Sequence, residues 1–94
     1  MNKMLINVNW RLQVMEMETR IKRIISELVE DKEIQNTISS ETNIIDDIGL
    51  DSLQMINFIL MLEDEFDIEI DFDEFEYEYL LKFSTLVEFI KGKL

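Results

Sequence analysis

The stretch GLDSLQM, Gly49 to Met55, brings a turn residue, an acid and a hydroxyl together at the start of an apolar run. Asp51 and Gln54 have the D-x-x-Q spacing of a capping box, in which two side chains satisfy free N–H groups at a helix N-terminus. We therefore predict a helix from Ser52 to about Phe66. By itself, a serine at such a helix start is most often part of ordinary capping.

The apolar residues of this predicted helix form two stripes. Eight of the ten residues from Leu53 to Leu62 are apolar, which is too many for one buried face. The broader stripe suits a core and consists of Met55, Phe58, Ile59, Leu62 and Phe66. The second stripe consists of Leu53, Ile56 and Leu60. This stripe is an exposed contact surface, the lining of a cavity, or a surface covered by the N-terminal leader, and we favour the contact surface.

The flanking segments complete an all-α pattern. Apolar residues recur at helical spacing from about Glu16 to Glu33, and residues 35–50 are rich in Asn, Ser, Thr and Asp, which favour a loop. A short helix is expected around Glu74 to Leu81, and a last one with Ser84 or Thr85 as its N-cap. Isoleucines in the loop would pin it to the core. The expected fold is a small bundle of three to four helices with a long loop between the first and second.

Residues 1–15 are ambiguous. Their alternation of apolar and polar residues fits a strand, whereas Leu5, Val8, Leu12 and Met15 fit a helical stripe. A natural start at Met15 or Met17 would make the leader an upstream extension. We divide the chain into an extension of uncertain structure and function, residues 1–15, and one domain, residues 16–94.

Composition excludes several chemistries. The 94 residues include no Cys and no His, which excludes the usual zinc sites and the Cys/His and Ser/His nucleophile systems. The net charge is −12, and residues 1–15 carry two basic residues and no acid, so residues 16–94 carry −14. Such a polyanion disfavours nucleic acid and anionic membranes and favours basic protein surfaces. No apolar run is long enough to span a membrane and no secretion signal is evident, so we expect a cytoplasmic protein.

An acidic segment after the predicted second helix imitates a calcium loop. Its acids occupy loop positions 1, 3, 5, 7 and 12 and are Asp67, Glu69, Asp71, Asp73 and Glu78. Phe72 occupies the sixth position, where the sharp turn requires glycine. We therefore predict no EF-hand and assign no metal ligand.

Three segments carry a resemblance to a known family. DDIGLDSL at residues 46–53, LEDEFDIEI at 62–70 and FSTLVEFI at 83–90 resemble the acyl carrier protein family, and the likeness extends over residues 16–94. The resemblance implies that a phosphopantetheinyl transferase attaches a phosphopantetheine arm to Ser52. The thiol of this arm would hold an acyl or aminoacyl group as a thioester. The resemblance further implies a monomeric carrier, not an enzyme, that presents this group to enzymes of fatty acid, polyketide or specialised metabolism.

The resemblance also implies a partner face. Leu53, Ile56 and Leu60 match its apolar part; Asp47, Glu63 and Asp64 match its acidic rim, and Asp51 suits recognition by a basic transferase. Gln54 and Asn57 stand where fatty-acid-type carriers often have acids, which favours dedicated partners. The alternatives are a peptidyl or D-alanyl carrier, or an unmodified acidic helical interaction module.

Overall fold

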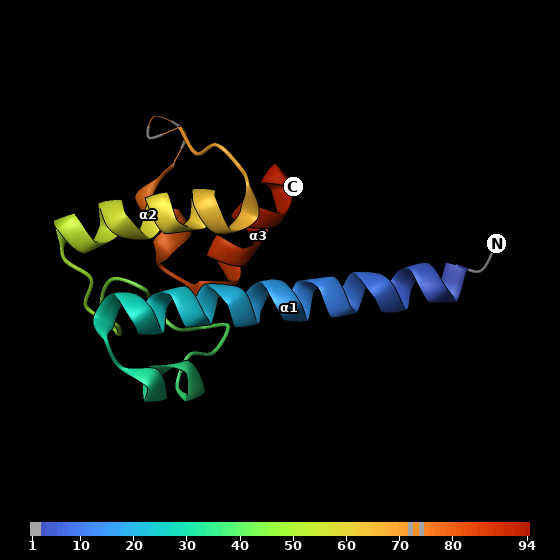
Figure 1. Cartoon of the computed structure of the whole chain (residues 1–94), viewed down its shortest axis with the longest axis horizontal. Coiled ribbons are helices and arrows are strands. Elements are labelled where there is room, and N and C mark those ends of the chain that lie inside the picture. The colour runs from blue at the N-terminus through green and yellow to red at the C-terminus, as the bar shows by residue number, and fades with distance from the viewer. Residues whose placement is uncertain (1–2, 72, 74) are drawn as a thin grey trace.

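The computed structural model describes residues 3–71, 73 and 75–94, with side chains from Leu12 onward. Its elements are α1 (Lys3–Val29), a 3-10 turn η1 (Lys32–Asn36), α2 (Ser52–Phe66), a second 3-10 turn η2 (Tyr77–Leu80) and α3 (Phe83–Lys93) (Figure 1). Within these residues every regular element is helical, which confirms the predicted all-α bundle. The long loop between the first and second helices is also present.

Helix α1 is longer at its start and shorter at its end than the sequence pattern predicted. It begins at Lys3, not near Glu16, so the helical interpretation of the leader is the one found. It ends at Val29, not at Glu33, because Glu30 has a positive φ of 55° and the Asp31 N–H donates to the Ser26 carbonyl at 3.0 Å. The expected boundary at residue 15 therefore falls inside one continuous helix.

The core lies where α1, α2 and α3 meet. In Figure 1, α1 and α2 run side by side in opposite directions, and η1 lies on the other side of α1. Helix α2 buries Phe58, Ile59, Leu62 and Phe66, as predicted, while Met55 is partly buried against them. The α1 side of the core is Met17, Ile21, Ile24 and Ile25, and the α3 side is Phe83, Leu86, Val87 and Ile90.

Arg20 fastens α1 to the end of α2. Its Nε donates to Glu65 Oε2 at 2.7 Å, its Nη2 donates to the Glu65 carbonyl at 2.6 Å, and its guanidinium lies 4.5 Å from the centre of the Phe66 ring. Because the two side chains are about one-third exposed, solvent screens the attraction between their charges. The main effect of the pair is to fix the direction of α2 relative to α1.

The long loop is held onto the bundle, as its isoleucines predicted. Ile38, Ile44 and Leu50 are buried, and Ile45 and Ile48 are partly buried against the core. The Ile44 N–H also donates to the Leu80 carbonyl of η2 at 2.9 Å. The loop therefore has a defined path up to α2.

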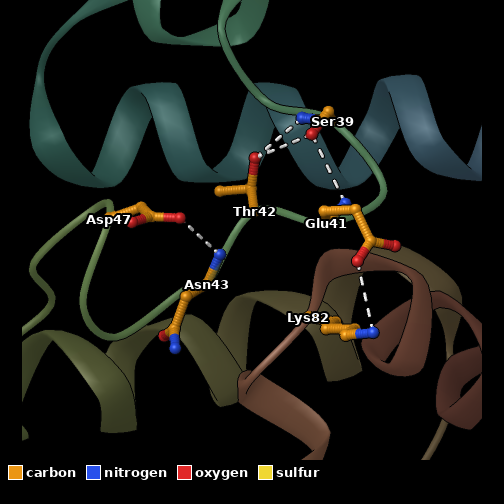
Figure 2. A network of polar contacts seen from close by, with 6 residues as sticks. All are labelled: Ser39, Glu41, Thr42, Asn43, Asp47 and Lys82. Atoms are coloured by element: carbon orange, nitrogen blue, oxygen red, sulfur yellow. Dashed lines mark hydrogen bonds and ion pairs between the residues drawn. The ribbon is translucent and has the colours of Figure 1, made fainter.

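The prediction for the start of α3 is wrong. The helix begins at Phe83, and its N-cap is Lys82, whose side chain makes no capping bond. The long loop satisfies the free N–H groups instead: Phe83 donates to the Thr42 carbonyl at 2.8 Å and Ser84 to the Ser40 carbonyl at 3.0 Å. Lys82 forms an ion pair with Glu41 at 3.2 Å (Figure 2). Ser84 and Thr85 are not needed as caps because distant carbonyls accept these bonds.

The segment before α3 contains less helix than the sequence predicted. The expected helix around Glu74 to Leu81 is the 3-10 turn η2, Tyr77–Leu80. Glu74, and Phe72 of the acidic segment, lie outside the described residues. The rings of Phe75 and Tyr79 lie 5.3 and 4.6 Å from the Phe89 ring, measured between centroids, and attach this segment to α3.

Candidate functional site

Ser52 is the first residue of α2 and is exposed. The N-cap is Asp51: its Oδ1 accepts from the Gln54 N–H at 2.8 Å, while the Gln54 Oε1 accepts from the Asp51 N–H at 3.1 Å. This confirms the predicted capping box. Within the described part of the chain, no hydrogen bond engages the Ser52 hydroxyl. Helix capping therefore leaves this hydroxyl available.

The approach to Ser52 depends on a left-handed glycine. Gly49 has a φ of 82°, in the region that residues with a Cβ rarely adopt, and its N–H donates to the Ile45 carbonyl at 2.9 Å. The next residue, Leu50, is buried. The turn thus anchors the chain in the core directly before Asp51 and Ser52 emerge at the surface.

Asn43 organises the loop segment that leads to this turn. Its Oδ1 accepts from the N–H groups of Ile45 at 2.9 Å and Asp46 at 2.8 Å, while its own N–H donates to Asp47 Oδ2 at 2.9 Å (Figure 2). Sequence analysis did not single out Asn43. The signal is an Asn before a short turn, because Asn side chains accept bonds from nearby backbone N–H groups.

The second stripe of α2 is open to solvent. Leu53, Ile56 and Leu60 are 68%, 45% and 51% exposed. In Figure 1 the N-terminus of α1 lies at the end of the bundle away from the start of α2, so the leader does not cover this stripe. We call these three residues the partner stripe. Its role in binding stays a prediction.

The acids expected to form a rim around the partner stripe have different environments. Asp51 and Asp64 are exposed, although one oxygen of Asp51 accepts the capping bond. Asp47 accepts the bond from Asn43, and half-buried Glu63 accepts from the Ile70 N–H at 2.7 Å through its Oε2. Asp47 and Glu63 therefore shape the loops on either side of α2, in addition to any effect of their charges.

A shallow groove of about 560 Å³ extends the partner stripe toward α1. Its apolar residues are Leu28, Leu60 and Met61, and its polar residues are Glu27, Glu30, Asn57 and Asp64. The groove therefore combines an apolar surface with carboxylates and contains no basic side chain. This composition complements an apolar residue flanked by Lys or Arg on another protein.

Two further features of the described residues bear on function. They include no group of three or more acidic side chains placed to hold a metal ion. None of their helices combines the length and the apolar character needed to cross a membrane. The five acids aligned with a calcium loop in the sequence thus do not form a described metal centre.

Comparison with known proteins covers most of the chain. Residues 19–90 match the family described as phosphopantetheine attachment site. Over 79 residues the chain is 34% identical to the acyl carrier protein of Desulforapulum autotrophicum, covering 84% of this chain and 99% of that protein. It is 42% identical over 79 residues to the acyl carrier protein of Buchnera aphidicola subsp. Acyrthosiphon pisum, covering 81% of this chain and 90% of that protein.

Proposed function

Because the chain belongs to the acyl carrier protein family, whose members are carriers with a covalent phosphopantetheine arm and not enzymes, we propose that Ser52 bears this arm. The supporting observation is the exposed, unengaged Ser52 hydroxyl at the start of α2, beside a cap that Asp51 already supplies. When attached, the arm supplies a thiol that holds an acyl or aminoacyl group as a thioester. The chain itself has no cysteine to compete with that thiol.

The local structure fits a phosphodiester at Ser52. The N–H groups of the first helical turn point out of the helix and carry the positive end of its dipole, which favours a phosphate by about 0.3–1 kcal/mol. Asp51 opposes the phosphate through its negative charge. We assign Asp51 two roles: it caps α2, and it offers a carboxylate to a basic phosphopantetheinyl transferase.

The partner stripe then supports contact with the enzymes that load and process the carried group. Leu53, Ile56 and Leu60 begin one residue from Ser52 and continue along one exposed face of α2. Asp64 extends this face, and the carboxylates of the groove continue it onto α1. This surface is complementary to enzymes that present an apolar contact residue surrounded by basic residues.

We further propose dedicated partner enzymes in a specialised pathway. Gln54 takes part in the capping box, and Asn57 is exposed, so the first two turns of α2 lack the acids common in fatty-acid-type carriers. Gln54→Glu keeps a capping residue at the same helix position. We expect the pair Gln54→Glu and Asn57→Asp to raise kcat/KM for a loading enzyme of general fatty acid synthesis. An unchanged or lower kcat/KM would contradict the assignment.

The attachment site is tested by intact mass after incubation with coenzyme A and a phosphopantetheinyl transferase. We expect one arm per chain and a modified peptide that contains Ser52. Ser52→Ala should gain no mass, whereas Ser40→Ala, which changes another exposed serine, should gain one arm. No gain in the wild type would leave an unmodified acidic interaction module as the better proposal. An equal gain in Ser52→Ala would place the arm on another residue and contradict the assignment of Ser52.

A further inference from the structure

The groove between α1 and α2 is bordered by acids from both helices. Glu27 and Glu30, three residues apart on α1, contribute two carboxylates, and Asp64 on α2 contributes a third. All three residues are exposed. Within the described residues, no ion pair and no side-chain hydrogen bond engages these carboxylates. Their charges are therefore available to a ligand.

Two basic residues close to the α1 edge belong to a different groove. Arg23 and Lys32 line a neighbouring groove that shares Glu27 and Glu30 with the first. Among the described residues, neither of these basic side chains forms an ion pair with either glutamate. The α1 edge thus keeps two carboxylates that no cation of the described chain contacts directly.

The apolar part of the groove is continuous with the partner stripe. Leu60 belongs to both, while Leu28 and Met61 are partly buried against the core. Sites for small molecules bury most of their ligand, whereas this groove of about 560 Å³ is shallow. Such a surface suits apolar side chains inserted from another protein.

We propose that this groove binds a basic amphipathic helix of a partner protein, with the apolar stripe of that helix against Leu28, Leu60 and Met61. Helices α1 and α2 lie side by side in opposite directions, so a groove between them follows their axes and suits a third helix (Figure 1). Acids on both edges match a helix that carries Lys or Arg on both sides of its apolar stripe.

The proposed site lies beside Ser52 without covering it. With a rise of about 1.5 Å per residue, Asn57 and Asp64 lie about 8 and 18 Å along α2 from Ser52, and Ser52 itself does not line the groove. Partner recognition then includes Glu27 and Glu30 of α1, to which sequence analysis assigned no role. That the partner is an enzyme handling the carried group rests on the function proposed for Ser52.

Fluorescence anisotropy of a labelled synthetic helix tests the proposal on the full chain. The probe has a row of leucines with lysines on both flanks. We expect Glu27→Lys, Glu30→Lys to weaken its binding about tenfold, because two attractions become repulsions. The matched control is Glu76→Lys, Glu78→Lys, which makes the same change of net charge at two exposed acids outside the groove and should weaken binding less than about twofold. Circular dichroism checks that all the proteins are folded.

Three results of this titration overturn the proposal. The first is a wild type that does not bind the leucine probe. The second is an equal loss of binding in the two double variants, which would mean that only net charge matters. The third is undiminished binding of a second probe in which glutamine replaces every leucine, because the groove would then be an acidic surface without an apolar contact.

Methyl resonances in NMR spectra locate the bound probe. Those of Leu28 and Met61 should shift when the leucine probe binds. Shifts confined to Leu53 and Ile56 would place the probe on the partner stripe alone and overturn the proposal. The same holds if an arm bearing a hydrocarbon acyl group shifts Leu28 and Met61 while the probe does not, since the groove would then hold the carried group.

The titration separates the groove from the function proposed for Ser52. It is made on protein without the arm, and Ser52→Ala should bind the leucine probe as the wild type does. A chain that gains the arm but does not bind the probe would retain the carrier function and contradict the groove. A chain that binds the probe through Glu27 and Glu30 but gains no arm would give the opposite result.

Discussion

Asp51 combines two roles that substitution can separate. Its Oδ1 accepts the Gln54 N–H at 2.8 Å, and its charge faces solvent beside Ser52. Asp51→Ala removes the acceptor and should lower the free energy of unfolding by about 1 kcal/mol, within the 0.5–2 kcal/mol range of N-cap substitutions. For a domain of this size that loss corresponds to a fall in Tm of about 4–8 °C.

Asp51→Asn keeps an oxygen acceptor at the same place and removes the charge. Because Asn is about as good an N-cap as Asp, we expect a stability loss below about 0.5 kcal/mol. Both variants should slow arm attachment by a basic transferase, since both lack the carboxylate. Urea unfolding of the protein without its arm measures stability, and the initial rate of mass gain measures attachment. Equal destabilisation by Asn and Ala would refute the capping role, and attachment rates that follow stability alone would refute the charge role.

Three further outcomes are expected. Gly49→Ala should destabilise the protein by roughly 1–2 kcal/mol because Gly49 has a φ of 82°. Gly92→Ala in α3 has open space around the added Cβ and should stabilise the protein by a few tenths to about 1 kcal/mol. Shifts of the urea midpoint in the same direction for both variants would contradict this. Ile44→Ala should destabilise by about 2–5 kcal/mol because Ile44 is fully buried, and a loss below about 1 kcal/mol would show that the loop is not pinned there. The net charge of −12 should make Tm rise with NaCl, and a flat Tm would show that self-repulsion is negligible.

Local patterns were sufficient to predict the start and the two faces of α2. The capping box of Asp51 and Gln54 depends on residues three apart, and the two apolar stripes depend on helical spacing alone. The core positions Phe58, Ile59 and Leu62 and the exposed positions Leu53 and Leu60 followed from that spacing. A high density of polar residues similarly identified the long loop.

Contacts between distant segments could not be predicted. The cap of α3 comes from carbonyls of Ser40 and Thr42, more than forty residues earlier in the chain. Glu63 was predicted as a surface acid, but the chain turns after α2 and brings the Ile70 N–H to its carboxylate. The start of α1 was ambiguous because the leader satisfies strand and helix spacing at once. Only the arrangement of elements in space resolves these positions.

The partner stripe of α2 is next to Ser52 and is surrounded by acids, which suits enzymes with basic surfaces.

The intact mass of the protein purified from its native cells tests the carrier function most directly. We predict a species heavier than the chain by one phosphopantetheine, with or without an acyl group, and fragmentation that places the added mass on Ser52. Fragmentation would also identify the carried group. A population with only the unmodified mass, or with the arm on another residue, would contradict the assignment of Ser52.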